Sequence, residues 1–170
     1  LHPNGHDGKV IIDPNSGEVF GVPRRLENIY RTNMQTAYSA GQYQGYMANI
    51  DSRPYWMYDA VGDHRTRPAH AAMDGLVYRY DDPFWTTFYP PNGYRCRCSV
   101  IALSERDMQR EGKVLSQSGE HNLVDTHKVY NKKGDSYPTI AYKAPDGSLH
   151  TTDRGFGYNA GRMNYRPNLD

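Results

Sequence analysis

The sequence predicts an α+β fold, in which one long N-terminal helix packs on a small antiparallel sheet, with many loops and an extended C-terminal tail. Three observations lead to this prediction. Residues 24–48 have a helical pattern, short aromatic-rich segments follow within residues 55–102, and turns rich in Gly and Pro separate these segments. The length of 170 residues suits one domain, or one domain with an extension.

The composition indicates a thin hydrophobic core. Hydrophobic residues make up 37% of the chain, below the roughly 45–50% that is usual, although fifteen Tyr and two Trp contribute large rings. The net charge of +1 is not the bulk signature of a nucleic-acid binder. No signal peptide opens the chain and no apolar run approaches the ~20 residues that span a bilayer, so we expect no membrane contact. No glycine-rich phosphate loop occurs either, and we expect no small-molecule substrate.

The N-terminal elements are predicted from turns and helical spacing. Residues 10–12 and 18–20 should pair across a turn at residues 15–17, and Pro23 suits a helix start. The helix at residues 24–48 carries a stripe typical of a core-facing side, with small residues at its end that would let another backbone approach closely. The stripe consists of Leu26, Ile29, Tyr30, Asn33, Ala37, Ala40 and Gly41.

Strands are predicted by alternation at residues 55–60, 76–80 and 94–102, with a short helix that begins at Pro68. Ser104 and Asp107 form a capping-box pattern that should open another short helix. We expect residues 113–127 to be irregular, residues 129–131 to pair with 137–142, and the Gly-rich residues 155–161 to wrap over another surface.

Two cysteines near the end of the third predicted strand are candidate metal ligands. Cys96 and Cys98 lie two residues apart and should point to one face, where a disulfide between them would be strained. Two thiolates on one face can bind zinc, and a closed structural site needs two more ligands. His70 and Asp63 are the nearest candidates, with His64 as the alternate. Because Cys-x-Cys is a weaker zinc signal than Cys-x2-Cys, two ordinary buried thiols are the alternative.

Arginines surround the same segment, namely Arg65, Arg67, Arg95 and Arg97. Arg95 and Arg97 would share the face opposite the cysteines, which makes these four residues candidates for contact with DNA phosphates. The alternative is that the arginines pair with nearby carboxylates, and the balanced charge of the chain favours it. The carboxylates in question are Asp63, Asp74, Asp81 and Asp82.

The segment from residue 56 to residue 100 carries an ordered set of motifs, which are Asp63, Arg65-Thr66-Arg67-Pro68, His70, Asp74-Gly75, Pro83-Phe84-Trp85, Tyr89-Pro90-Pro91-Asn92-Gly93 and Cys96-Arg97-Cys98. This set resembles the phage head morphogenesis family, the Mu F-like minor head proteins. Residues 25–33 and 153–159 also look like that family, although Arg154 and Ala160 stand where it usually has Pro. The resemblance covers nearly all of residues 9–170.

The resemblance divides the chain into a turn-rich lead-in at 1–23, a Mu F-like core at 24–103 and a C-terminal extension at 104–170. It implies a minor head protein of a tailed phage or prophage that acts in procapsid assembly and DNA packaging, without enzymatic activity. The implied partners are the portal protein, capsid or scaffold proteins, and double-stranded DNA. The implied location is the virion, in the head interior or at the portal vertex, and the bacterial host cytoplasm during assembly. Because the family domain normally extends further upstream, we expect the C-terminal part of a longer protein.

The alternative function is a metal-dependent nuclease, or an effector that is ejected with phage DNA. His70, Asp63 and the cysteines would then surround an open metal position, and Arg65 or Arg67 would stabilise phosphate charge. A catalytic zinc site usually has three protein ligands and one water, whereas a structural site is closed by four. The number of protein ligands therefore separates the two functions.

Overall fold

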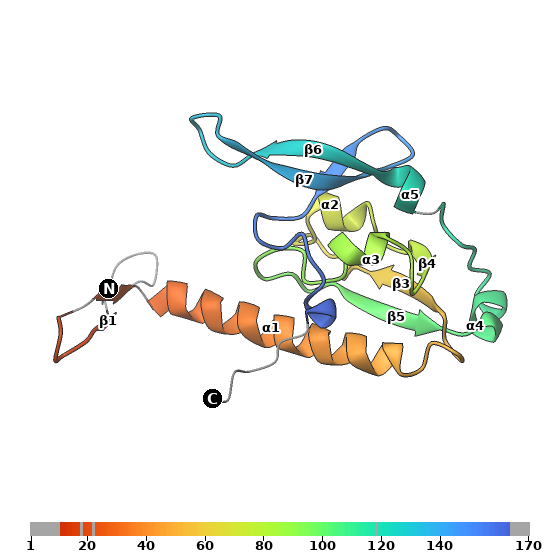
Figure 1. The fold of residues 1–170 in the computed structure, drawn as a ribbon, viewed down its shortest axis with the longest axis horizontal. Coiled ribbons are helices and arrows are strands. Elements are labelled where there is room, and N and C mark those ends of the chain that lie inside the picture. Colours follow the sequence, from red (N-terminus) through yellow and green to blue (C-terminus); the bar gives the residue numbers. More distant parts are fainter. Residues whose placement is uncertain (1–10, 18, 22, 118, 164–170) are drawn as a thin grey trace.

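The computed structural model describes residues 11–17, 19–21, 23–117 and 119–163. It confirms the α+β prediction, with one long helix and two small three-stranded antiparallel sheets. Figure 1 shows helix α1 (Pro23–Met47) along one side of the first sheet and the second sheet on the other side. Short helices lie between the two sheets. None of the helices in the described ranges is long and apolar enough to cross a membrane.

A small hairpin precedes α1, as the turn residues predict. Strand β1 (Ile11–Ile12) pairs antiparallel with β2 (Val19–Gly21), and α1 begins two residues later at Pro23. Proline is suited to this position because the first N–H groups of a helix have no partner inside the helix.

The first sheet has β3 (Tyr55–Asp59) at its centre, between β4 (Val77–Arg79) and β5 (Ser99–Leu103). All three predicted strands exist, but the third begins at residue 99 and not at residue 94. Ser99 lies opposite Asp59, the last residue of β3, so residues before Ser99 have no partner strand to continue the ladder. Both cysteines therefore precede the strand and do not lie on it.

The core between α1 and the first sheet is mainly aromatic, in agreement with the composition. Trp56 is fully buried, and its ring lies 5.5 Å from that of Tyr43 and 5.8 Å from that of Trp85, centroid to centroid. Trp85 belongs to α3 (Phe84–Thr87), a short helix that the sequence did not predict. This helix places Phe84 and Trp85 in the core with no exposed surface.

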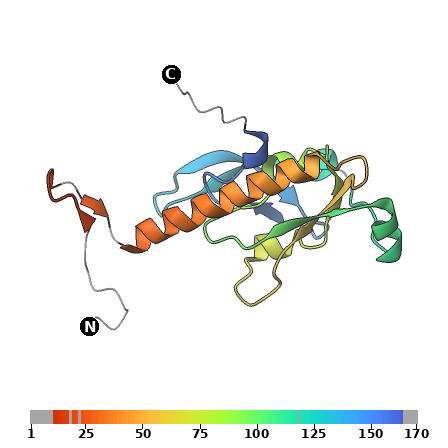
Figure 2. The same ribbon diagram turned by 90° about the horizontal axis from the view of Figure 1, so that it is seen from below.

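The predicted core-facing stripe of α1 is wrong. Ser39 and Tyr43 are buried, whereas Asn33, Ala37 and Gly41 of the predicted stripe are exposed. The N-terminal half of the helix projects beyond the first sheet (Figures 1 and 2), so only its C-terminal half packs against the core of that sheet. A Cβ atom at Gly41 would meet nothing within 4 Å, so the close approach that we expected there does not occur.

The second sheet consists of β6 (Leu123–Val129), β7 (Ser136–Lys143) and β8 (Leu149–Thr151). The predicted hairpin is present, but β6 begins within the segment that we expected to be irregular, directly after α5 (Gly119–Asn122). Polar residues are tolerated in β6 because much of the strand faces solvent. The sheet joins the core through β7, whose Tyr142 ring lies 6.0 Å from that of Phe84.

The C-terminal segment lies on α1, as the prediction of a wrapping tail requires. The 3-10 helix η1 (Ala160–Arg162) meets the helix where the Gln44 side chain donates a 2.6 Å hydrogen bond to the Gly161 carbonyl. The guanidinium of Arg162 donates to the Tyr43 hydroxyl at 3.1 Å. Behind this contact, the Asn159 amide donates to the Trp85 carbonyl at 2.9 Å, which links the tail to α3.

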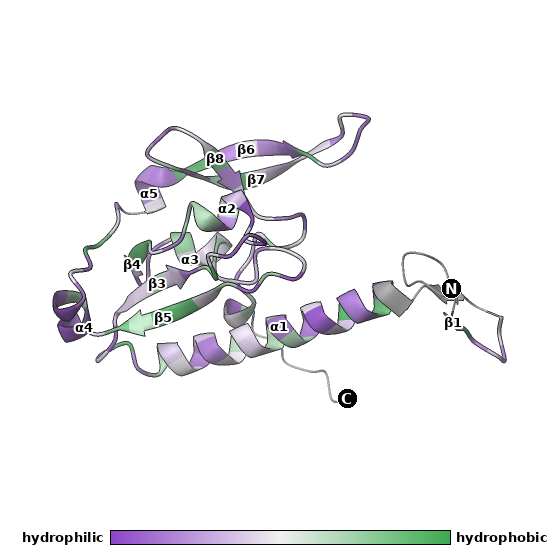
Figure 3. Cartoon of the chain, turned by 180° about the vertical axis from the view of Figure 1, so that it is seen from behind, coloured by the Kyte–Doolittle hydropathy of each residue, from purple (hydrophilic) through white to green (hydrophobic). Residues whose placement is uncertain are grey.

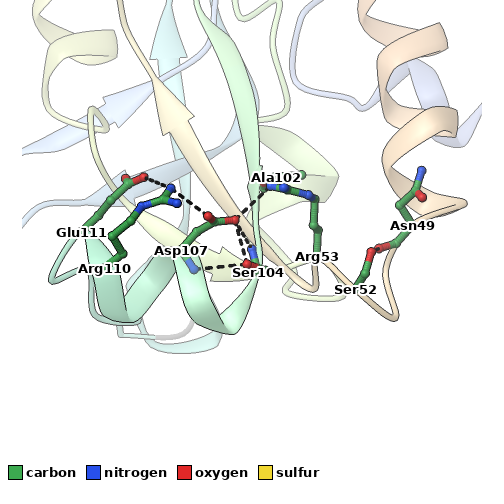
Figure 4. Close-up of polar contacts among 8 residues, drawn as sticks. All are labelled: Asn49, Ser52, Arg53, Ala102, Ser104, Asp107, Arg110 and Glu111. Carbon is green, nitrogen blue, oxygen red and sulfur yellow. Dashed lines mark hydrogen bonds and ion pairs between the residues drawn. The ribbon is translucent and has the colours of Figure 1, made fainter.

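Helix α4 (Glu105–Arg110) confirms the predicted capping box. The Asp107 N–H donates to the Ser104 hydroxyl, and the Asp107 carboxylate accepts from the Ser104 N–H (Figure 4). Arg53 and Arg110 also donate to this carboxylate, each from about 3 Å (3.0 and 2.8 Å). Figure 3 shows α4 as hydrophilic and the preceding β5 as hydrophobic, which agrees with their positions at the edge and in the core.

Replacing Asp107 with asparagine should lower the melting temperature at pH 7 but not at strongly acidic pH. The hydrogen bond from the Ser104 N–H is the main reason why the pKa of Asp107 lies below its ordinary value of 3.8. A carboxyl group whose pKa is lowered by folding stabilises the protein above its unfolded pKa and loses this effect as the pH falls through the folded pKa. Thermal unfolding from pH 7 to pH 2 should show the parent and the variant converging at the acidic end. An equal difference at every pH would contradict this explanation.

Candidate functional site

Three of the four predicted metal ligands meet in the interior. The His70 Nδ1 atom lies 3.3 Å from the Cys98 sulfur and 3.7 Å from the Cys96 sulfur. The three ligand atoms all lie within 4.8 Å of one another, and each residue is only 4–5% exposed. The geometry therefore forms a compact set of one imidazole and two thiols, which is a donor set typical of zinc.

Two local structures bring these residues together. His70 lies on α2 (Pro68–Ala71), which begins at the predicted proline. On the other side, the Cys96 N–H closes a turn by donating to the Gly93 carbonyl at 3.2 Å, and Arg95 has a left-handed φ of 57° within that turn. The following residues alternate, so the cysteines point inward and Arg97 points outward, as the spacing predicted.

Asp63, the fourth predicted ligand, does not join this cluster. Its carboxylate forms a two-pronged ion pair with Arg97, with N–O distances of 2.6 and 2.8 Å. This pairing, more than any other contact, holds the pKa of Asp63 well below its usual range. The guanidinium fork matches a carboxylate in geometry, so Asp63 is already engaged as the partner of an arginine. The alternate candidate, His64, is exposed.

Two buried polar residues beside the sulfurs were missed by the sequence analysis. The Tyr58 hydroxyl donates to the Asn92 side-chain oxygen at 2.8 Å, and neither residue has exposed surface. The backbone N–H of Asn92 also donates to the Cys96 sulfur. The Tyr58 hydroxyl, whose one hydrogen is donated to Asn92, is also a polar neighbour of Cys98. Asn92 lies in the Pro-Pro-Asn-Gly turn and Tyr58 alternates with the core residue Trp56, which are the signals that could have identified them.

The two thiols differ in acidity because they are neighbours. The hydrogen bond from Cys98, followed by that from His70, lowers the pKa of Cys96 to about 4. The pKa of Cys98 is raised, first by this same hydrogen bond to Cys96 and then by burial. The two thiols therefore titrate as a pair, and the loss of a proton from one sulfur makes the loss of the second proton harder.

The cluster lines a groove of about 1030 Å³ between α1 and the loops at residues 61–67 and 91–98. One wall is formed by Tyr30, Met34 and Tyr38, which follow one another at intervals of four on α1 and which we call the α1 stripe. Their side chains are 66%, 55% and 69% exposed. The spacing of four is visible in the sequence. The predicted core-facing stripe included Tyr30 but continued through Asn33 and Ala37, and it did not include Met34 and Tyr38.

The four predicted DNA-binding arginines also line this groove, and each has a partner within the chain. Arg65 and Arg97 both pair with Asp63, as the alternative interpretation predicted. Arg67 forms a 3.3 Å ion pair with Asp153. Arg95 donates a 2.8 Å hydrogen bond to the Asn28 side chain of α1.

Comparison with known proteins gives consistent matches. The family described as "Phage Mu protein F like protein" matches residues 8–101, and a further family domain matches residues 125–162. The "Mu-like prophage FluMu F protein" of Haemophilus influenzae is 44% identical over 153 residues, which cover 88% of this chain and 37% of that protein. The "Putative capsid assembly protein F" of Escherichia phage Mu is 41% identical over 170 residues, or 95% of this chain and 38% of that protein.

The chain thus spans less than two fifths of the length of these two relatives. No solved structure matches it. The family match includes α1, β3, β4, the first three residues of β5 and all three residues of the candidate metal cluster.

Proposed function

Because this chain belongs to the family of Phage Mu protein F like proteins, we propose that it is a minor head protein of a tailed phage or prophage, which acts in procapsid assembly and DNA packaging near the portal without enzymatic activity. The observation that carries this proposal is the similarity, along nearly the whole chain, to a protein named as a putative capsid assembly protein. Its place would be the head interior or the portal vertex, after assembly in the bacterial cytoplasm.

The exposed α1 stripe supports a function in protein assembly. Its two tyrosines and one methionine line the groove and remain more than half exposed, so the protein's own core does not cover them. Neighbouring apolar side chains that remain exposed on one helical face typically mark a surface for another protein. We therefore propose the portal protein and a capsid or scaffold protein as the partners of this face.

Contact with double-stranded DNA is a secondary proposal. The groove carries Arg65, Arg67, Arg95 and Arg97, which is the basic chemistry that phosphates require. However, three of these arginines already pair with carboxylates, so a phosphate would have to compete with Asp63 or Asp153. Binding should weaken as salt increases, since contacts between arginines and phosphates are screened.

Replacing Tyr30 and Met34 with alanine should reduce co-purification of the chain with portal or capsid proteins at least about tenfold, because removing hot-spot side chains of 1–2 kcal/mol each changes affinity by that factor. Both side chains are exposed and alanine favours helices, so the melting temperature should stay unchanged. The same double variant in the phage genome should lower the yield of DNA-filled heads, counted by electron microscopy.

The matched control is Val114→Ala, because Val114 is 80% exposed but lies in the segment after α4, away from the α1 stripe. This variant should assemble as the parent does. Unchanged co-purification and head yield for the double variant would contradict the proposed docking face. Metal-dependent cleavage of DNA or RNA by the purified chain, lost in a folded His70→Ala variant, would contradict the non-enzymatic function and favour the nuclease alternative.

A further inference from the structure

We propose that His70, Cys96 and Cys98 form a zinc site with three protein ligands, and that its fourth coordination position is open to the groove. The inference is independent of the proposed function in head assembly, because it depends only on the geometry and chemistry of these three side chains.

The distances between the ligand atoms fit a tetrahedral zinc ion. Zinc–sulfur bonds of about 2.3 Å and zinc–nitrogen bonds of about 2.0–2.1 Å place sulfur and nitrogen roughly 3.6 Å apart in tetrahedral geometry. The observed separations from His70 Nδ1 are 3.3 Å to Cys98 and 3.7 Å to Cys96, on either side of that value. An ion can therefore be accommodated by small side-chain adjustments, without a change in the backbone.

The surroundings of the sulfurs distinguish a metal site from a pair of ordinary buried thiols. An inert buried thiol packs among apolar groups as a small hydrophobic residue. Here the backbone N–H of Asn92 donates to the Cys96 sulfur, and the Tyr58 hydroxyl, itself held by Asn92, is a polar neighbour of Cys98. Hydrogen-bond donors aimed at thiolates are the usual outer partners of metal ligands, since they orient the sulfur and stabilise its charge.

The fourth position is left to a ligand from the groove. Asp63, the nearest predicted carboxylate, is paired with Arg97, and His64 is exposed. His70 and both cysteines line the groove, although each is almost completely buried. A site with three protein ligands completes its tetrahedron with water or another small ligand. In the isolated chain we assign this position to water from the groove.

The test uses the purified, reduced chain, and zinc is measured by elemental analysis after dialysis. We expect one zinc ion per chain. Cobalt(II), used as a spectroscopic substitute, should give the charge-transfer absorption of thiolate ligands and the visible bands of a tetrahedral site. The variants Cys96→Ser, Cys98→Ser and His70→Asn should each weaken metal binding at least about 100-fold, because losing an outer partner alone costs 10–100-fold.

Two control variants test the assignment of the ligands. His64→Asn and Asp63→Asn should bind metal as tightly as the parent, since neither side chain is assigned as a ligand. Loss of binding in Asp63→Asn, with the fold retained, would contradict the open fourth position. If the ligand variants fail to fold, the parent chain decides the question, since the absence of both zinc and the cobalt charge-transfer absorption overturns the site.

Azide tests whether the fourth position is open. When added to the cobalt-loaded chain, azide should replace water and shift the visible cobalt bands, because the groove gives a small anion access to the ion. Unchanged bands at saturating azide would show a closed site with a fourth protein ligand. That result would contradict the proposed coordination even if zinc is bound.

Discussion

Replacing Trp56 with alanine should lower the free energy of unfolding by about 3–5 kcal/mol, the usual cost of removing a large buried ring. Trp56 is fully buried on β3, the central strand of the first sheet. Its ring centroid lies 5.5 Å from that of Tyr43, 5.8 Å from that of Trp85 and 5.9 Å from that of Tyr89, all in edge-to-face arrangements. The substitution would thus leave a cavity where α1, β3 and α3 meet.

Urea denaturation, followed by circular dichroism, measures this effect directly. Tyr30→Ala is the matched control, because it removes an aromatic ring that is 66% exposed on α1. This control should change the stability by no more than about 0.5 kcal/mol. Trp56→Phe, which keeps a ring at the centre of the cluster, should fall between the two. Equal stabilities for Trp56→Ala and Tyr30→Ala would show that the aromatic cluster is not the centre of the core.

The elements that the sequence predicted well are those that depend on neighbouring residues. The helix start at Pro23 and the capping box of Ser104 and Asp107 satisfy backbone groups within a few residues, so their sequence patterns are sufficient. The hairpin of β6 and β7 was predicted from its turn, but its first strand was placed at residues 129–131, whereas β6 ends at Val129. Local chemistry determined these features, and tertiary contacts did not override it.

The elements that were predicted incorrectly depend on residues far away in the chain. Strand β5 begins at Ser99 because its partner β3 ends at Asp59, which lies forty residues earlier in the sequence. Nothing in the residues around Cys96 indicates where that partner strand ends. The buried side of α1 is set by where the sheet ends, because only the part near Tyr43 has a core beside it. Helical spacing shows that several faces are possible but not which of them is covered.

The candidate site shows the same division. Alternation along the chain was enough to place Cys96 and Cys98 on one side and Arg97 on the other, even without a strand ladder. The position of Asp63 was not predictable, because a carboxylate in this loop has two possible partners, a metal ion and an arginine. Only the three-dimensional arrangement shows that Arg97 lies within 2.6 Å of it.

Replacing Gly161 with alanine should destabilise the protein by about 1–3 kcal/mol, the cost of forcing an extra methyl group into a packed site. A Cβ atom at Gly161 would lie against the ring of Tyr43, closer than real Cβ atoms approach other heavy atoms. That ring is only 6% exposed and packs edge-to-face on Trp56 and Tyr89, so it has no space to move. The strain should therefore lift η1 away from α1, with loss of the hydrogen bond from Gln44.

Urea denaturation and limited proteolysis of the C-terminal segment test this expectation together, since a detached η1 should be cut faster. Gly41→Ala is the matched control, because Gly41 lies on α1 with nothing within 4 Å of its added Cβ atom. That variant should stabilise the helix by about 0.5–1 kcal/mol, since alanine loses less backbone entropy than glycine in a helix. The same change from glycine to alanine should thus lower the stability at Gly161, which packs against α1, and raise it at Gly41, which lies on α1. A Gly161→Ala variant as stable and as protease-resistant as the parent would contradict the close packing of the tail on α1.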